Sequence, residues 1–169
     1  AVVVKDEALA KEFMVFRNYG SEKRYYNKVV GTNSRLDEIQ AGLLRIRLSH
    51  MEELTQEKIE IASRYTKGVH NPRIKLPQIP EGSTCVYHQY VIRCEERDRL
   101  IEYLNEKEIG TIIHYPIPPH LAEAYRYLGH QEGDFPITEH LAGTVLSIPM
   151  YNGMTEDEQN VVIDALNRF

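Results

Sequence analysis

A stretch without proline, from residue 34 to residue 71, constrains the fold of this chain more than any other feature. Apolar residues recur in it at spacings of three and four: Leu36, Ile39, Leu43 and Ile46. This spacing predicts one helix over residues 34–71, with Asn33 or Ser34 as its N-cap. At about 1.5 Å per residue the helix would be roughly 50 Å long. So long a helix needs support from another domain or subunit.

The segments before this helix have a different character. Residues 6–17 show helical apolar spacing behind an acidic first turn, and residues 2–4 are typical of the end of a strand. Residues 18–33 are polar and aromatic with turn residues at both ends, so we expect a loop with room for a short hairpin. The first residue is not Met, and we interpret it as an internal cut rather than a natural beginning.

After Asn71 and Pro72 the pattern alternates between strands and helices. Strands are expected at residues 85–94, 111–115 and 146–150, and helices at 95–107, 120–128, 136–144 and 155–169. This alternation predicts an α/β or α+β layer in which helices pack on a small sheet. Three parts follow: residues 1–33 as a remnant of a larger domain, 34–71 as a bridging helix, and 72–169 as a small domain.

Composition excludes several classes of function. The net charge is −5 with both signs mixed along the chain, so no basic block indicates a nucleic-acid partner. No apolar run approaches the length of a membrane span. Cys85 and Cys94 lie at the two ends of one expected strand, too far apart for a disulfide, and the default location is the reducing cytoplasm.

Two constellations carry possible chemistry. The loop from Asn18 to Arg35 interleaves lysines, arginines and tyrosines, which suits a phosphate or pyrophosphate, although a solvated surface loop has the same composition. Asn33 either caps a helix or faces an anion together with free backbone N–H groups. His114 and Tyr115 end an expected strand before rigid prolines, which fits either a binding site or a structural histidine. No spacing of residues predicts a metal site.

Longer runs resemble one family. NYGSEKRYYNKVVGTNSRLDEIQAGLLRIRL (18–48), VYHQYVIRCEERDRLIEYLNEKEIGTIIHYPIPPH (86–120) and EGDFPITEHLAGTVLSIPMY (132–151) closely resemble the DegT/DnrJ/EryC1/StrS sugar aminotransferases, in particular enzymes that make dTDP-linked 3-amino-3,6-dideoxyhexoses. The resemblance implies the C-terminal part of a fold-type I enzyme that depends on pyridoxal 5′-phosphate (PLP). It implies a homodimer that transfers an amino group from glutamate to a nucleotide-linked keto-sugar.

The resemblance also implies roles for single residues. Asn33 matches an asparagine that reaches the partner subunit's PLP phosphate, and Arg35 matches an arginine that supports that site or the amino donor. Lys28 and Tyr25 belong to a loop near the nucleotide diphosphate. His114 and Tyr115 match a pair that lines the sugar pocket. The family's imine-forming lysine precedes the matched part, so no catalytic residue is assigned, and this chain alone is expected to be inactive.

Three alternatives remain open. Some family members carry histidine in place of the lysine and dehydrate the sugar instead of aminating it. Others act as regulators. The predicted helix over residues 34–71 would also suit a non-catalytic dimerisation or binding module.

Overall fold

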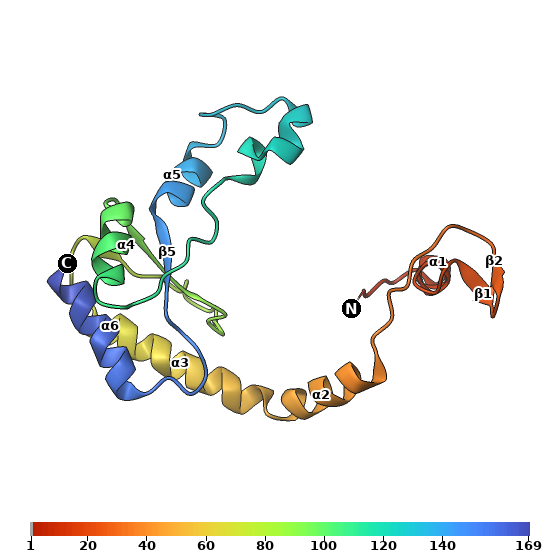
Figure 1. Cartoon of the computed structure of the whole chain (residues 1–169), viewed down its shortest axis with the longest axis horizontal. Helices are drawn as coiled ribbons and strands as arrows, with labels where there is room; N and C mark the ends of the chain where they lie inside the picture. The colour runs from red at the N-terminus through yellow and green to blue at the C-terminus, as the bar shows by residue number, and fades with distance from the viewer. Residues whose placement is uncertain (1) are drawn as a thin grey trace. The chain divides into compact units, whose positions relative to one another are not determined.

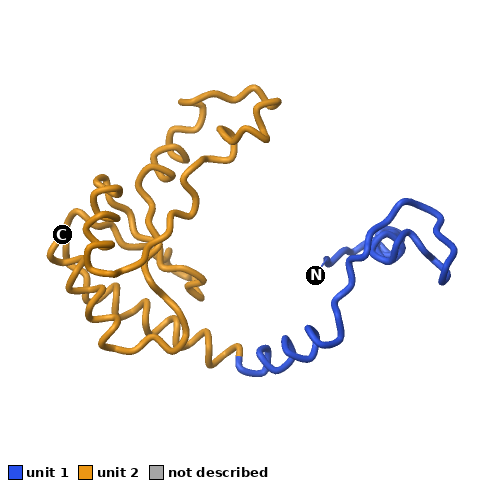
Figure 2. Tube along the Cα trace, viewed as in Figure 1, with its two compact units in different colours: residues 1–50 blue, residues 51–169 orange. Residues whose placement is uncertain are grey.

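The computed structural model describes residues 2–169, and the chain divides into two compact units, residues 1–50 and residues 51–169 (Figure 2). The first unit holds one helix, a hairpin and a second helix. The second unit holds a small antiparallel sheet with helices packed against it (Figure 1). The mixed α and β content agrees with the fold class expected from the sequence.

The first unit begins with helix α1, Glu7–Phe16. Its N-cap is Asp6, whose carboxylate accepts hydrogen bonds from the backbone N–H groups of Ala8 at 2.7 Å and Leu9 at 3.1 Å. Strands β1 (Ser21–Lys23) and β2 (Tyr26–Asn27) then pair as an antiparallel hairpin, which confirms the short hairpin expected there. Residues 2–4 pair with no strand within residues 2–169, so the prediction that they end a strand whose partners are missing stays a prediction.

The single helix predicted over residues 34–71 is two helices, α2 (Glu38–Ser49) and α3 (Met51–Gly68). The hydroxyl of Ser49 donates to the carbonyl of Ile46 at 2.7 Å, a bond that competes with the helix ladder. His50 follows with φ −105° and ψ 10°, outside the helical region. The N-cap residue of α2 is Asp37, so neither Asn33 nor Ser34 caps this helix.

Helices α1 and α2 bury none of their residues. Nine of their apolar side chains are instead 40% exposed or more: Leu9, Phe13, Met14, Phe16, Ile39, Leu43, Leu44, Ile46 and Leu48. An apolar helix face of this kind normally packs against another element. The first unit therefore has the amphipathic pattern of core helices without a core of its own.

In the second unit, three strands form a sheet in the order β3 (Ile74–Lys75), β4 (Tyr90–Cys94) and β5 (Val145–Ile148). Both pairings are antiparallel, and Tyr90 stands opposite Ile148 in the register of β4 and β5. This arrangement brings residues more than fifty positions apart in the sequence onto adjacent strands.

The strands are shorter than the sequence suggests. The run expected at residues 85–94 is extended and paired only from Tyr90, because Tyr87 takes a left-handed φ of 47°. The run expected at residues 111–115 contributes a single bridge, Ile112 to Ser147. Prolines begin directly after it and cannot donate to a sheet ladder. Strand β3 was not expected, and β5 confirms the strand expected near residues 146–150.

The helices of the second unit agree better with expectation. They are α3, α4 (Arg97–Asn105), α5 (Pro136–Thr144) and α6 (Glu156–Arg168). Thr155 and Glu158 form the predicted capping box of α6. The core between helices and sheet includes seven fully buried side chains: Tyr65, Tyr90, Ile92, Leu100, Leu104, Leu146 and Leu166.

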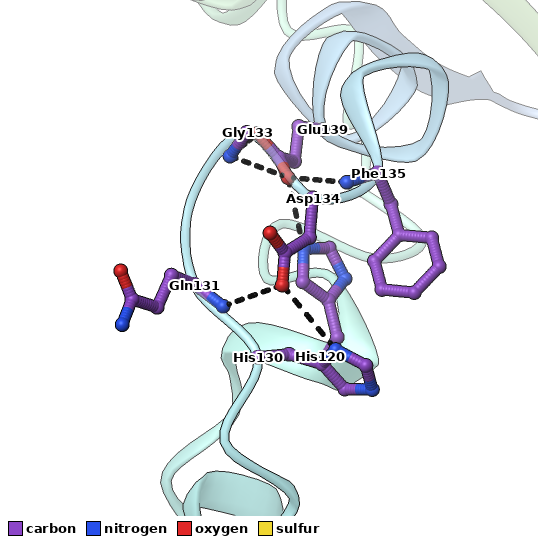
Figure 3. Close-up of polar contacts among 7 residues, drawn as sticks. All are labelled: His120, His130, Gln131, Gly133, Asp134, Phe135 and Glu139. Atoms are coloured by element: carbon purple, nitrogen blue, oxygen red, sulfur yellow. Dashed lines mark hydrogen bonds and ion pairs between the residues drawn. The ribbon is translucent and has the colours of Figure 1, made fainter.

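In place of the one helix expected at residues 120–128, the connection between His114 and α5 holds two short 3₁₀ helices, Pro119–Leu121 and Glu123–Leu128. It is tied back to α5 through Glu139 (Figure 3). The Glu139 carboxylate lies 2.9 Å from Nε2 of His120 and accepts from the backbone N–H of Gly133 at 2.9 and 3.0 Å and of Phe135 at 3.1 Å. The His120 imidazole is nearly covered and meets the Phe135 ring edge-on, with centroids 4.7 Å apart.

These bonds predict acid sensitivity of the loop. The backbone N–H of Gly133 and then His120 hold the pKa of Glu139 below its ordinary value of 4.5. A lowered carboxylate pKa stabilises the folded loop above that ordinary value, and the contribution is lost as pH falls from it through the folded pKa. We therefore expect hydrogen-exchange protection of Gly133 and Phe135 to fall on acidification, and Glu139→Gln to lower it already at neutral pH.

The matched control is Glu132→Gln, which changes an exposed carboxylate in the same loop. It should leave the protection of both amides unchanged. Equal protection in wild type and Glu139→Gln at neutral pH would contradict the role given to Glu139.

Candidate functional site

The clearest polar cluster of the first unit is centred on the guanidinium of Arg35. Its Nε donates to Oδ1 of Asn33 at 3.2 Å, and its Nη1 donates to Oδ1 of Asn18 at 3.1 Å. The same guanidinium lies over the ring of Tyr19, 5.4 Å from the ring centroid. Arg35 thereby joins the two ends of the 18–35 loop.

The backbone brings these side chains together. Asn18 and Asn33 form an isolated antiparallel bridge, and Tyr19 N–H donates to the carbonyl of Thr32 at 3.0 Å. Two glycines permit the close return of the loop to the end of α1. A Cβ at Gly31 would lie 2.2 Å from the nitrogen of Gly20, and Gly20 itself has a φ of +73°.

The orientation of the two amides follows from the arginine. A guanidinium only donates, so the oxygens of Asn18 and Asn33 face Arg35 and their NH₂ groups face away from it. Within residues 2–169, no hydrogen bond uses Nη2 of Arg35 or Nδ2 of either asparagine. Both amide oxygens that face Arg35 accept a hydrogen bond from it. The groups of the cluster that are left without a bond are N–H donors, and they lie next to a positive charge. This is the donor set that suits a phosphate.

A hollow of about 470 Å³ opens beside this cluster. It is lined by Asn18, Tyr19, Ser21, Arg24, Tyr25, Asn27 and Arg35. Tyr25 is largely exposed in a left-handed conformation, φ 71°, and the Arg24 guanidinium lies 4.9 Å from its ring centroid. The sequence-predicted residues Tyr25 and Arg35 thus share one hollow.

Lys28 lies elsewhere on the hairpin. Its ammonium group pairs with the carboxylate of Glu22, and this hydrogen bond and charge hold the pKa of Glu22 below its ordinary value. Lys28 does not line the hollow beside Arg35. Asn18 and Arg24 do line it. From the sequence, Arg24 was one of the basic residues of the loop that suit a phosphate, and Asn18 was marked only as the start of that loop.

A second cluster, in the second unit, surrounds His114. Its Nδ1 lies 2.9 Å from Oγ of Ser147 in β5, and its Nε2 lies 3.2 Å from Nε2 of Gln89, just before β4. His114 and Tyr115 are joined by a cis peptide bond, and their rings meet edge-on with centroids 5.5 Å apart. His114 is half-buried, whereas Tyr115 is 74% exposed.

His114, Gln89 and Ser147 line a hollow of about 430 Å³. Lys58, His88 and Thr111 are also on its wall, and the Thr111 hydroxyl is buried without a hydrogen-bond partner. Tyr115 is not part of this wall. The structure thus places His114 on the wall of this hollow and leaves Tyr115 outside that wall and largely exposed.

Two other classes of site find no support in residues 2–169. No group of three or more histidine, cysteine, aspartate or glutamate side chains is arranged to hold a metal ion there. Across the same residues, no helix combines the length and the apolar character that a membrane crossing requires.

Comparison with known proteins places these features in a family. The sequence profile of the DegT/DnrJ/EryC1/StrS aminotransferase family matches residues 1–167. The chain is 42% identical over 169 residues to the dTDP-3-amino-3,6-dideoxy-α-D-galactopyranose transaminase of Aneurinibacillus thermoaerophilus, covering 100% of this chain and 46% of that protein. It is 41% identical over 167 residues to the erythromycin biosynthesis sensory transduction protein EryC1 of Saccharopolyspora erythraea, covering 98% of this chain and 46% of EryC1.

Solved structures give the same result. The crystal structure of DesV from S. venezuelae in complex with a ketimine intermediate superposes with a TM-score of 0.90 at 38% identity, over 98% of this chain and 45% of DesV. The chain spans less than half the length of the relatives it matches. On the family profile, the sequence identity and the shared fold, this chain belongs to the DegT/DnrJ/EryC1/StrS aminotransferase family.

Proposed function

We propose that this chain supplies the C-terminal half of a PLP-dependent enzyme that transfers an amino group from glutamate to a nucleotide-linked keto-sugar. The observation that carries the proposal is the donor set around Arg35, in which the acceptors facing the arginine are occupied and the outer N–H groups are free. The named activity of the A. thermoaerophilus relative, at 42% identity over the whole chain, supports the same reaction class.

The residues present fit the phosphate group of PLP. Nη2 of Arg35 and the NH₂ groups of Asn33 and Asn18 offer N–H donors and a positive charge to a doubly charged anion. When bound, PLP supplies the electron sink that makes a proton on the amino-bearing carbon removable. Arg35 and Asn33 bind and orient the cofactor through its phosphate, far from the reacting bonds.

Other predicted residues act on the substrate. Tyr25 lines the hollow beside Arg35 and offers a phenol to the nucleotide diphosphate, and Lys28 adds a cation on the same hairpin once it leaves Glu22. His114 and Tyr115 form the sugar side of the site. The phenol of Tyr115 suits a hydroxyl group, and the faces of the two rings suit the apolar face of a hexose.

The remaining catalytic parts come from an N-terminal half. The matched relatives are more than twice as long as the part that this chain covers, which leaves room for a PLP-binding domain carrying the reactive lysine. Residues 1–33 belong with that domain in this proposal, and residues from about 72 form the small domain. The enzyme is a cytoplasmic homodimer in which Asn33 and Arg35 reach the cofactor of the partner subunit.

The chain alone should not form a lysine-bound cofactor. On titration with PLP, we expect no stoichiometric visible band, because the lysines of this chain lie outside the matched family's imine site. Borohydride reduction followed by peptide mapping should then find no single labelled lysine. A saturable band trapped on one residue, such as Lys23 or Lys28, would show that the chain carries its own imine site and would contradict the proposal.

The phosphate role of Asn33 and Arg35 is testable in a chimera that joins the N-terminal half of the A. thermoaerophilus transaminase to this chain. Arg35→Ala removes a charge and the group that orients both asparagines. We expect a loss of PLP affinity of roughly tenfold to a hundredfold, in line with about 1.5–3 kcal/mol for a charged hydrogen bond. Asn33→Ala should weaken PLP less, since the arginine remains.

The matched control is Lys67→Ala, which removes an exposed cation in the last turn of α3. It should leave PLP affinity unchanged. Both variants are measured by equilibrium dialysis of the cofactor, with folding checked by circular dichroism. Unchanged PLP affinity in a folded Arg35→Ala chimera would remove this cluster from the cofactor site.

A regulatory role is the second candidate, because EryC1 is named as a sensory transduction protein. A regulator would bind its ligand without turnover. The chimera separates the two: release of 2-oxoglutarate from glutamate in step with amino-sugar formation favours the enzyme, and tight nucleotide-sugar binding without either product favours the regulator. A dehydratase would consume the sugar without consuming glutamate.

A further inference from the structure

The hydrogen bonds of His114 use both of its ring nitrogens inside the protein. Nδ1 faces the hydroxyl of Ser147, and Nε2 faces the amide nitrogen of Gln89. An imidazole whose two nitrogens are both engaged has no free polar atom for a sugar hydroxyl. A group that recognises the substrate in this hollow must therefore be a neighbour of His114.

The direction of the hydrogen bonds can be assigned. An amide nitrogen only donates, so Nε2 of the imidazole accepts from Gln89. A neutral imidazole carries its one proton on the other nitrogen, so Nδ1–H donates to Oγ of Ser147. The three side chains form one hydrogen-bond relay, in which Gln89 donates to His114 and His114 donates to Ser147.

Ser147, the last residue of this hydrogen-bond relay, is held in place by its backbone. Ser147 is buried in β5, where its backbone faces Val91 of β4 on one side and bonds to Ile112 on the other. Its N–H donates to the Ile112 carbonyl at 2.8 Å, and Ile112 N–H donates back at 3.2 Å. A hydroxyl fixed between two backbone neighbours sets the plane of the imidazole, and the imidazole sets the amide plane of Gln89.

Gln89, the first residue of the relay, has a free acceptor. With its NH₂ turned to His114, Gln89 presents Oε1 as an acceptor that makes no hydrogen bond within residues 2–169. Gln89 is half-buried on the wall of the same hollow as His114 and Lys58. Lys58 Nζ donates to the carbonyl of His88 at 3.2 Å, and no hydrogen bond joins it to Oε1 within residues 2–169.

We propose that Gln89 is a specificity-determining residue that accepts a hydrogen bond from a hydroxyl of the keto-sugar, and that His114 and Ser147 are positioning residues that hold its amide. The assignment of the ligand rests on the proposed function. The hydrogen-bond relay of Gln89, His114 and Ser147 rests only on the geometry of these side chains. Sugars that lack a hydroxyl at this point leave Oε1 unpaired on a partly desolvated wall, which disfavours them.

The first test uses the chain as it is. Nitrogen-15 NMR of the histidine side chains at about pH 8, where an ordinary imidazole is neutral, distinguishes a protonated from a bare ring nitrogen. We expect His114 as the Nδ1–H tautomer. Gln89→Glu replaces the donor by an acceptor and should move the proton to Nε2, whereas Gln89→Met should leave it on Nδ1. An Nε2–H tautomer in the wild-type chain would overturn the proposal, because the Gln89 amide would then present its NH₂ to the hollow.

The second test uses the chimera and separates substrate reading from catalysis. Gln89→Met should raise the KM for the nucleotide sugar by about tenfold, the usual cost of one lost hydrogen bond, and leave the glutamate half-reaction unchanged. Ser147→Ala should raise the same KM less and broaden the tautomer signal, with Ser147→Thr restoring both. An unchanged KM in Gln89→Met would overturn the specificity role.

Failure of the role given to Gln89 can be distinguished from failure of the proposed function. A wild-type chimera that binds PLP but never aminates a sugar removes the proposed function, while the tautomer measured in the isolated chain still decides the geometry. A turnover-competent chimera with the wrong tautomer removes only the role of Gln89.

Discussion

The hydrogen bonds of Arg35 to Asn18 and Asn33 are the interaction on which the candidate cofactor site depends. One guanidinium fixes the orientation of two amides at opposite ends of a loop, because it can only donate. The amide NH₂ groups then face away from the arginine together with its own free Nη2. The charge, the direction of the donors and the closure of the loop all come from a single side chain, and Gly31 allows the close approach that the closure needs.

The two units differ in how they are stabilised. The second unit has a buried core, with Tyr65, Leu104 and Leu146 fully covered, and its last helix, α6, begins with a capping box. In the first unit, α1 and α2 bury none of their residues. Local hydrogen bonds such as those of Asp6 and Arg35 hold its elements, and burial contributes little. A site carried by such a unit is expected to reach its working geometry only when its apolar faces are covered.

Sequence reasoning succeeded where a pattern is local. The apolar period and capping box of α6 predicted that helix almost to its ends, and turn residues marked the hairpin of β1 and β2. The break at His50 was missed because the apolar period continues across it, while the bond that competes with the ladder comes from the single hydroxyl of Ser49. Strand β3 has only two residues, too few to show alternation.

The sites depended on contacts that no local pattern contains. Family resemblance pointed to Asn33, but the expected helix cap is instead an amide held by Arg35 and aligned with Asn18. His114 was singled out, yet its partners Gln89 and Ser147 lie 25 and 33 positions away in the sequence. Only the pairing of β4 with β5 and the bridge at Ile112 bring those three residues together.

The central claim is that these residues complete a nucleotide-sugar aminotransferase when an N-terminal half is supplied. The most direct measurement is amino-sugar formation by the PLP-loaded chimera from carbon-labelled dTDP-linked 3-keto-6-deoxyhexose and nitrogen-15 glutamate, followed by mass spectrometry. The account predicts a dTDP-amino sugar carrying the nitrogen-15 label, with one 2-oxoglutarate formed for each. A folded, PLP-loaded chimera that transfers no nitrogen-15 to any such keto-sugar would contradict it.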